Sequence, residues 1–190
     1  MKLSKFYASQ LNLRERKGLD AAYQSKMRAL MRDVHEGDWS EEQKKVQKVS
    51  ILSNIALYQV FLERGIEKKR ALELVRMKAY RKAHRAHKVL STFFMIPGFP
   101  ELFRKMMSKQ IKKRDLWQSE VLADSRHAYS VDIKKCLWAD TCAHFDCPEL
   151  CEVFCLSDPI IFGNLRRMNF QRTQTLGMSG NKCDFRFHFK

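Results

Sequence analysis

The sequence predicts an α+β fold, in which a helical N-terminal half packs with a small antiparallel sheet formed by the C-terminal half. The first observation is that apolar residues recur every three or four positions up to about residue 125, which is the period of an α-helix. The second is that apolar and polar residues alternate beyond that point, as they do along half-buried strands. The third is the composition, 45% hydrophobic and 30% charged, which is typical of a folded globular chain.

The chain has 190 residues, enough for one compact domain or two small ones. Its formal net charge is +15, and residues 1–125 carry most of it, with 27 Lys/Arg against 14 Asp/Glu. Residues 126–190 carry nine against seven, and they contain all six cysteines. We therefore expect a basic helical region over 1–125 and a cysteine-rich α+β region over 126–190, together forming one compact domain.

The sequence also predicts a cytoplasmic protein. No run approaches the roughly 18 apolar residues that a membrane span needs. The first residues lack the apolar segment of a secretory signal. Thiols stay reduced in the cytosol, so six cysteines point to chemistry or metal binding before disulfides.

Two helices are expected in the first third of the chain. The first covers about residues 8–34 and is followed by Gly37. The second begins at Ser40, because Gln43 three residues later completes the spacing of a capping box. Gly65 suits the residue that follows its last turn.

Two further helices are expected before residue 125. A third helix over about residues 67–93 has small alanines along its apolar stripe, which favours close packing. The prolines at 97 and 100 then break the chain. Pro100 can occupy the first turn of a fourth, basic helix, expected to end near Asp124.

The alternating segments predict strands from residue 127 onward. One strand covers about 127–133, and a short helix is expected to begin at Pro148 and to reach Cys155. Two more strands, over 167–176 and 182–189, flank a turn at 177–181 and should pair antiparallel.

Arg172 is the unusual residue of the first of these two strands. Counting by two places it on the apolar face with Met168 and Phe170. A guanidinium keeps its charge there and therefore needs an anion. Either it pairs with Asp158 or Asp184 or reaches the rim of the sheet, or it binds the carboxylate of a substrate.

The cysteines form two sets. Cys147, Cys151 and Cys155 are four residues apart and would share one helix face, with Asp158 about one turn further on. Free cysteines are commonly buried apolar residues, and we expect Cys142, Cys147 and Cys151 to be of this kind. No pair has the Cys-x-x-Cys spacing of a structural zinc site.

The second set is Cys136, Cys155 and Cys183, which lie on three separate predicted elements and could converge. A thiolate nucleophile needs a base or a positive neighbour. Asp158 can act as an acid or a base, and Lys and Arg are abundant in this chain.

Short motifs follow one another through the last 60 or so residues: Cys136, Pro148-Glu149-Leu150, Phe154-Cys155-x-x-Asp158, Phe170-x-Arg172-Thr173-x-Thr175-Leu176, Gly180 and Cys183-Asp184-Phe185-Arg186-Phe187. This ordered series resembles the L-2-amino-thiazoline-4-carboxylic acid hydrolase family. The recurring Cys, Cys-x-x-Asp and Cys-Asp-Phe positions of that family fall on Cys136, Cys155, Asp158, Cys183 and Asp184.

The resemblance implies a hydrolase acting on carbon–nitrogen bonds in cyclic amidines, with a small carboxylate-bearing heterocycle as substrate. The named reaction opens a 2-aminothiazoline carboxylate to a carbamoyl-cysteine on a bacterial route to L-cysteine. From the resemblance we expect three catalytic residues: Cys155 as the nucleophile, Asp158 as an acid or base, and Cys183. Substrate contacts are expected from Arg172, as the carboxylate anchor, and from the group Cys136, Thr175 and Asp184.

Two functions of other classes stay open. A protein without turnover could bind a soft divalent metal such as zinc, or a small ligand, through Cys136, Cys155 and Cys183. None of the motifs requires a cofactor. The basic half could bind nucleic acid, but its Lys and Arg are spread over several helices with few aromatic residues, so a solvated surface is expected instead. The sequence does not predict an oligomeric state.

Overall fold

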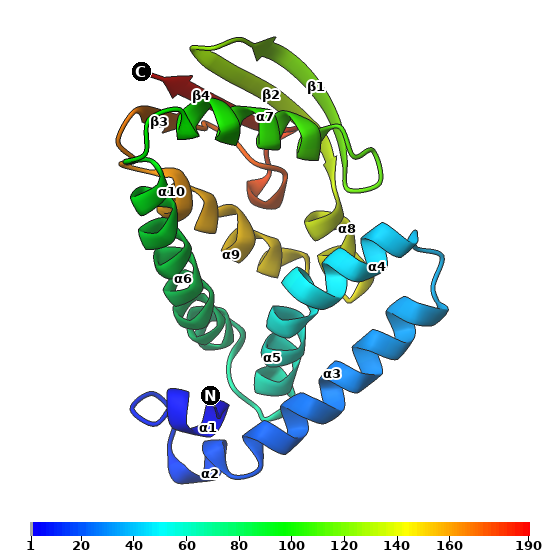
Figure 1. The fold of residues 1–190 in the computed structure, drawn as a ribbon. Helices are drawn as coiled ribbons and strands as arrows, with labels where there is room; N and C mark the ends of the chain where they lie inside the picture. Colours follow the sequence, from blue (N-terminus) through cyan, green and yellow to red (C-terminus); the bar gives the residue numbers. More distant parts are fainter. Residues whose placement is uncertain (1) are drawn as a thin grey trace. The chain divides into compact units, whose positions relative to one another are not determined.

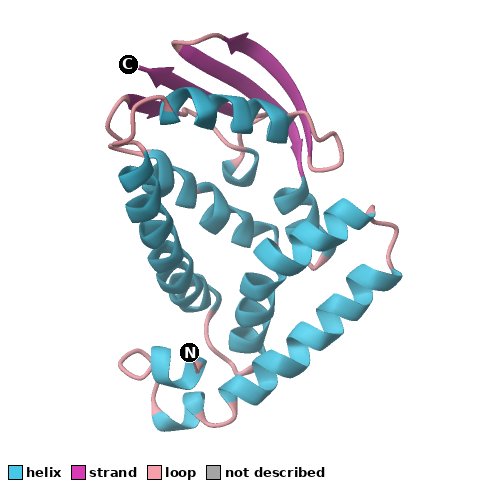
Figure 2. Cartoon of the chain, in the orientation of Figure 1, coloured by secondary structure: helices cyan, strands magenta, loops and turns pink. Residues whose placement is uncertain are grey.

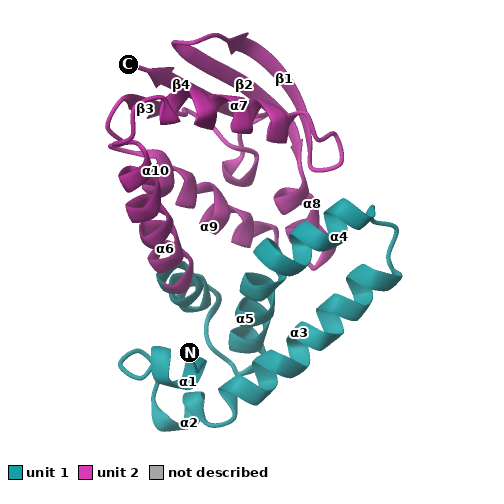
Figure 3. Cartoon of the chain, in the orientation of Figure 1, with its two compact units in different colours: residues 1–77 teal, residues 78–190 magenta. Residues whose placement is uncertain are grey.

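The computed structural model describes residues 2–190 and consists of two compact units, 1–77 and 78–190 (Figure 3). The helix α6 (Lys68–Phe93) runs through the boundary between them. The boundary between units therefore lies about 50 residues before the change in composition near residue 125. None of the described helices is long and apolar enough to span a bilayer.

The first unit begins with a short helix that was not predicted, followed by two helices where the sequence predicted one over 8–34. These are α1 (Leu3–Phe6), α2 (Leu13–Arg16) and α3 (Leu19–Glu36). The single long helix was wrong because Asn12 forms a capping box that starts α2, and Gly18 takes a left-handed conformation with φ of 72° before α3.

The second predicted helix is confirmed, although it has three parts. Ser40 forms the predicted capping box, accepting a hydrogen bond from the Gln43 backbone N–H at 3.3 Å. The chain then continues through α4 (Glu41–Val46), a π-helical turn η1 (Gln47–Ile51) and α5 (Leu52–Glu63). Most of α5 is buried, and it packs against α3 within this unit.

The third predicted helix matches α6 closely, but the fourth was too long. Helix α7 (Phe99–Ile111) ends well before Asp124, and residues Trp117–Asp124 form the strand β1 instead. Strand β1 pairs antiparallel with β2 (Ala128–Cys136) along its length, and this pairing outweighs the helical period of its sequence.

The second unit contains a four-stranded antiparallel sheet with the order β1-β2-β4-β3 (Figure 2). The last two predicted strands are confirmed as β3 (Met168–Gln171) and β4 (Cys183–Phe189), which pair with Phe170 opposite Phe187. The predicted α+β class, with a helical N-terminal part and a C-terminal antiparallel sheet, is confirmed. Strand β3 stops at Gln171, so residues 172–176 leave the sheet where the sequence predicted more strand.

The core of this unit lies between the sheet and α7, which crosses it in Figure 1. The sheet contributes Tyr129, Val131 and Phe187, and α7 contributes Phe103. The remaining elements are α8 (Leu137–His144), η2 (Pro148–Leu150), α9 (Cys151–Cys155) and α10 (Ser157–Phe162). Of these, the short helix from Pro148 to Cys155 was predicted and is confirmed as η2 and α9, whereas α8 and α10 were not predicted.

Candidate active site

Four of the six cysteines form a row of neighbouring thiols, which we call the thiol row: Cys147, Cys142, Cys151 and Cys155 in spatial order. Hydrogen bonds join the Cys142 thiol to Cys147 and to Cys151, and Cys151 to Cys155. The fold explains the row. Cys151 and Cys155 are four apart on α9, and the Cys147 backbone N–H donates to the Cys142 carbonyl at 2.9 Å after α8. All six cysteines are free thiols.

Cys151 is the thiol of the row that is best placed to ionise, because a thiol donor lies on each side of it. Hydrogen bonds from Cys142 and Cys155 lower the pKa of Cys151 below the ordinary thiol value, and burial opposes them. The hydrogen bond with Cys151, together with burial, raises the pKa of Cys155. Hydrogen bonds to Cys147 and Cys151 raise the pKa of Cys142. Within the row, Cys151 is therefore the thiol whose ionisation its neighbours favour.

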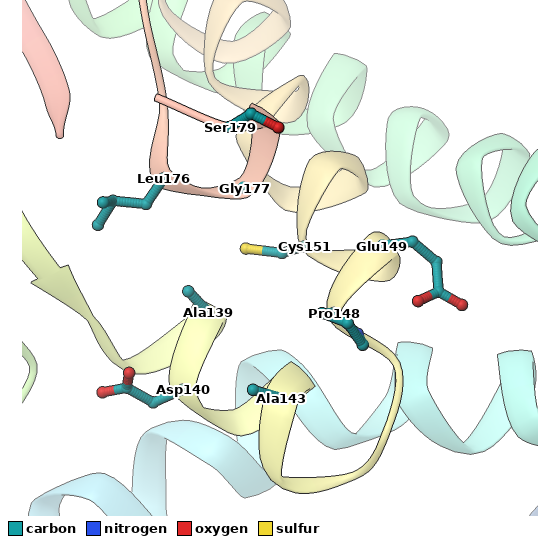
Figure 4. A pocket seen from close by; sticks show the side chains of 9 residues that line it. All are labelled: Ala139, Asp140, Ala143, Pro148, Glu149, Cys151, Leu176, Gly177 and Ser179. Atoms are coloured by element: carbon teal, nitrogen blue, oxygen red, sulfur yellow. The ribbon is translucent and has the colours of Figure 1, made fainter. Parts of the chain in front are cut away.

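Cys151 borders a cavity of about 490 Å³, within the range of small-molecule sites. Figure 4 shows its sulfur pointing into this cavity, between the helix α8 and the turn η3 (Leu176–Met178). The cavity is lined by Ala139, Asp140, Ala143, Pro148, Glu149, Cys151, Leu176, Gly177 and Ser179. We call it the thiol pocket. Two acidic residues, Asp140 of α8 and Glu149 of η2, also line it, and Figure 4 shows both side chains pointing away from the Cys151 sulfur.

Gly177 brings η3 directly onto two sulfurs of the thiol row. A Cβ at this position would lie 2.8 Å from the Sγ atoms of both Cys151 and Cys155. Such a contact is far shorter than van der Waals distance, so only glycine allows the turn to pack this closely. The backbone of η3 thus forms the wall of the thiol pocket that faces Cys151.

Residues of the C-terminal motifs hold η3 in this place. Cys183 Sγ accepts a hydrogen bond from the Leu176 backbone N–H at 3.3 Å. Asp184 accepts hydrogen bonds from the backbone N–H groups of Thr173 at 3.0 Å and Gln174 at 2.8 Å, and from the Thr173 hydroxyl at 2.6 Å. These bonds take the chain away from the strand ladder after Gln171, which explains why β3 ends there.

Arg172 forms an ion pair with Asp158, one of the two partners that the sequence suggested for it. Its Nη1 donates to Asp158 Oδ2 at 2.6 Å, and its Nη2 donates to the Cys155 carbonyl at 2.7 Å. Its guanidinium also lies over the Phe185 ring, 5.4 Å from the centroid. Only 5% of the Arg172 side chain is exposed, so both ends of its guanidinium are engaged within the protein.

Asp158 titrates in an unusual range. Burial raises the pKa of Asp158 to about 6, although the charge and hydrogen bond of Arg172 oppose this shift. Arg172 borders a second cavity, of about 310 Å³, together with Thr175. The Thr175 hydroxyl is buried and makes no hydrogen bond of regular geometry with the described residues, and it favours the ionised form of the neighbouring Cys155 thiol.

The structure thus brings most of the predicted site residues together, but not around one cavity. Cys155, Asp158, Arg172 and Cys183 are neighbours behind η3. Of the predicted residues, Arg172 and Thr175 border the smaller of the two cavities, and none borders the thiol pocket. Cys136 does not favour the thiolate form, because burial raises its pKa to about 12.

The thiol that faces the larger cavity is Cys151, which the sequence placed among the core cysteines. It is indeed buried, with 3% exposed, but its sulfur lines the pocket. Asp140 was also missed. Its signal in the sequence is weak, because an acidic residue four positions after Cys136 is equally typical of a solvated helix face. Burial raises the pKa of Asp140, and Lys135 opposes that shift.

The metal-binding alternative lacks an arranged set of ligands. Within residues 2–190, no three His, Cys, Asp or Glu side chains are placed so that they could hold one metal ion. Cys136, Cys155 and Cys183 therefore do not form a ready metal site in this conformation.

Replacing Gly177 with alanine should damage the site specifically. The added methyl group would force η3 away from Cys151 and Cys155, with an expected loss of about 1–3 kcal/mol of stability. The displaced pocket wall should lower turnover by roughly tenfold or more. Chemical denaturation measures the loss of stability, the rate of product formation measures turnover, and the rate of thiol alkylation reports the displaced wall. Gly65→Ala is the control, because its Cβ meets nothing within 4 Å and adds only backbone strain at φ of 75°. Unchanged stability and thiol reactivity in Gly177→Ala would contradict the packing described here.

The comparison with known families supports the resemblance seen in the motifs. No curated protein sequence and no solved structure matches the chain significantly. A family model described as L-2-amino-thiazoline-4-carboxylic acid hydrolase matches residues 43–187, which include both the thiol row and η3. This match supports an activity of the hydrolase type on a small heterocyclic substrate. Since it covers well over half of the sequence, the chain belongs to the L-2-amino-thiazoline-4-carboxylic acid hydrolase family.

Proposed function

We propose that the protein hydrolyses a 2-aminothiazoline-4-carboxylate-like ring in the thiol pocket, with Cys151 as nucleophile. The observation that carries the proposal is the position of the Cys151 sulfur, which faces the cavity and has a thiol donor on either side. The nucleophile expected from the motifs was Cys155. In this arrangement Cys155 stabilises the Cys151 thiolate and does not line the pocket.

The electrophile is the ring carbon that bears the amino group. It is bonded to the ring sulfur and to two nitrogens, so it accepts a nucleophile as amidines do. Attack by the Cys151 thiolate gives a tetrahedral carbon, with the electron pair of the carbon–nitrogen double bond moving to nitrogen, which takes a proton. The bond from this carbon to the ring sulfur then breaks, and the ring sulfur leaves as a thiol. The product of this step is an isothiourea linked to Cys151.

Water completes the reaction in a second step. It adds to the same carbon, and the bond to Cys151 breaks, which regenerates the thiolate and leaves a carbamoyl group on the substrate nitrogen. One water is consumed and both nitrogens remain on the carbamoyl carbon. The ring bond broken on the way to an N-carbamoyl-cysteine is therefore the carbon–sulfur bond. Cleavage of the ring carbon–nitrogen bond, expected from the class of cyclic amidines, would give the isomeric S-carbamoyl-cysteine.

Asp140 is the proposed proton donor to the leaving sulfur. It lines the thiol pocket, and burial raises its pKa, which favours the acid form. After it has given up its proton, the carboxylate can accept a proton from the attacking water. Lys135 Nζ lies 3.8 Å from Asp140 Oδ2. Arg172 is held closely by Asp158 at 2.6 Å, whereas the Lys135 pair is longer and exposed, so we propose Lys135 as the cation that binds the substrate carboxylate from beside the pocket.

The motif residues then act mainly by positioning. Arg172, Asp158, Cys183 and Asp184 fix the segment 172–176, and this segment fixes η3 against Cys151. A cytoplasmic location belongs to the same proposal, because a reducing compartment keeps the thiol row free of disulfides.

Replacing Asp140 with asparagine should lower kcat by about 100-fold, the effect typical of a lost general acid. The amide keeps the size of the side chain but cannot supply the proton. The dependence of kcat on pH should lose its fall on the alkaline side, which a structural role would leave in place. Asp146→Asn is the matched control, because Asp146 is exposed outside the pocket and its positive φ of 54° suits asparagine. Equal kinetics for the two variants would remove Asp140 from the mechanism.

The function itself is tested by incubating the full chain with 2-aminothiazoline-4-carboxylate in isotopically labelled water. Chromatography with mass detection should show a carbamoyl-cysteine that carries one labelled oxygen. An S-carbamoyl-cysteine, which has the same mass but separates by chromatography and carries no free thiol, would show that the ring carbon–nitrogen bond breaks. Loss of ammonia would show that the exocyclic amino group leaves instead. Stability of this substrate and of related cyclic amidines in the presence of the protein would overturn the proposed function.

A further inference from the structure

The turn between α6 and α7 carries an unusual group of exposed apolar side chains. Their exposed fractions lie between 45% and 59%, and within the second unit they are Val89, Phe93, Met95, Ile96, Leu102 and Met106. We call this group the apolar rim. Single exposed apolar residues are common on proteins, but six within 18 residues of sequence indicate a surface that meets something apolar.

The apolar rim follows from the helical geometry. Val89 and Phe93 are four apart on α6, and Leu102 and Met106 are four apart on α7, so each pair lies along one helix face. Met95 and Ile96 lie in the turn between these two helices, just before Pro97 and Gly98. The rim is therefore one stretch of chain that projects from the end of α6 and continues along the outer face of α7.

The apolar rim rests on a rigid base. The Phe93 ring stacks on Phe99, with ring centroids 5.2 Å apart. Phe99 in turn contacts Phe94 at 5.3 Å, and Phe94 is fully buried in the core of the second unit. Phe93 is held in place by this packing, so it can enter an apolar phase without first becoming ordered.

The segment that carries the apolar rim is strongly basic in sequence. Residues 81–114 contain ten Lys or Arg and a single acidic residue, Glu101, which gives this segment a net charge of +9. Glu101 is itself paired with Arg104 at 2.9 Å. Lys105 and Lys109 are exposed on α7, one residue before and three residues after Met106, and Arg166 reaches Met95 Sδ at 3.7 Å.

We propose that the apolar rim docks the protein on the surface of an anionic phospholipid bilayer. A bilayer interface accepts both components, because apolar side chains enter the acyl boundary while lysine and arginine heads remain among the phosphates. The negative surface of such a membrane matches the charge of the segment. A protein partner with a groove complementary to the rim would instead have to bury the lysines that lie between the apolar residues, or supply an acidic residue to pair with each lysine. This inference is independent of the proposed hydrolase activity.

Co-sedimentation of the full chain with phospholipid vesicles tests the proposal. The bound fraction should rise at least about tenfold when phosphatidylcholine vesicles receive a third of phosphatidylglycerol, and it should fall as salt is added. The variant with Phe93→Ser, Met95→Ser and Ile96→Ser should lose most of this binding. Lys105→Glu with Lys109→Glu should also lose it, although the rim is intact. The five substituted positions, Phe93, Met95, Ile96, Lys105 and Lys109, all lie outside the thiol pocket, so turnover in solution stays a check on folding.

The matched control is Leu13→Ser with Val49→Ser, two exposed apolar residues of the first unit, which should bind vesicles as the unchanged protein does. Equal binding to neutral and anionic vesicles, or loss in the control as in the rim variant, would overturn the proposal. A protein that is dimeric in solution, and monomeric when the rim is substituted, would also overturn the proposal, because the rim would then be an interface between two copies of the chain. Binding that needs an added protein would assign the rim to a protein partner instead.

Discussion

Replacing Cys151 with serine should lower the turnover of 2-aminothiazoline-4-carboxylate by roughly a thousandfold or more. A serine hydroxyl is nearly the same size as the thiol, but at neutral pH it does not ionise even with the donors of Cys142 and Cys155 beside it. The nucleophile is lost while the shape of the thiol pocket is kept. Turnover measured by formation of the carbamoyl product gives the result directly, and a thermal melt shows whether the fold is retained.

Two other cysteines provide the controls for this substitution. Cys147 lies at the outer end of the thiol row, is fully buried and does not line the pocket. Cys147→Ser should therefore cost about 1–2 kcal/mol of stability and keep most of the activity. Cys155→Ala removes one donor to the Cys151 thiolate and should raise the pH at which activity appears. Full activity in Cys151→Ser, with loss in Cys155→Ser, would return the nucleophile to Cys155.

Replacing Arg172 with methionine should have the largest effect on stability, and the effect should depend on pH. At pH 8 the variant leaves the Asp158 carboxylate in a largely buried site without its partner, with an expected cost of about 3–5 kcal/mol. Near pH 5 the cost should be much smaller. Loss of the guanidinium removes the interaction that lowers the pKa of Asp158, so the carboxyl is neutral there.

The direction of this pH dependence follows from the raised pKa of Asp158. Because burial holds the pKa of Asp158 at about 6 in the folded protein, above its ordinary value, this carboxyl favours the folded state at low pH. That contribution is lost as the pH rises through about 6. In the variant the folded pKa rises further, so the loss at pH 8 is greater. Urea unfolding at both pH values measures it, and the double variant with Asp158→Asn should recover most of the loss at pH 8. A cost independent of pH would contradict this account of the pair.

The same residue separates positioning from substrate binding. If Arg172 only fixes the segment 172–176, Arg172→Lys should reduce the catalytic efficiency for the carboxylate substrate and for its descarboxy analogue by equal factors. A substrate anchor would show a selective loss of about 1.5–3 kcal/mol for the carboxylate, since charge-assisted hydrogen bonds to it would be lost. A selective loss of this kind would return Arg172 to the role that the family resemblance implies.

Local signals in the sequence were sufficient for much of the fold. The capping box at Ser40 and the strand pair formed by β3 and β4 were both predicted, because each depends on residues close in the chain. Strand β1 was missed, since its helical period is overridden by pairing with β2. The end of β3 was missed for a similar reason. The carboxylate of Asp184, distant in sequence from that end, draws the backbone away from the ladder.

The site could be predicted only in part. The charge argument for Arg172 correctly required an anion, and Asp158 is the partner found. The spacing of the cysteines placed Cys151 and Cys155 on one helix face, but spacing cannot show which sulfur faces a cavity. That depends on Gly177, whose lack of a side chain lets η3 close over both sulfurs. No pattern along the chain relates a glycine in one turn to a thiol more than 20 residues before it.

The most direct test of the central claim is the mass of the protein during turnover. The full chain, mixed with 2-aminothiazoline-4-carboxylate and quenched in acid within the first turnovers, should gain the mass of one substrate molecule. Trypsin leaves Cys136, Cys142, Cys147, Cys151 and Cys155 together on one peptide between Lys135 and Arg166, so fragmentation of that peptide must locate the adduct. The account predicts the adduct on Cys151. An adduct on Cys155 or Cys183, or steady turnover with the protein mass unchanged throughout, would contradict it.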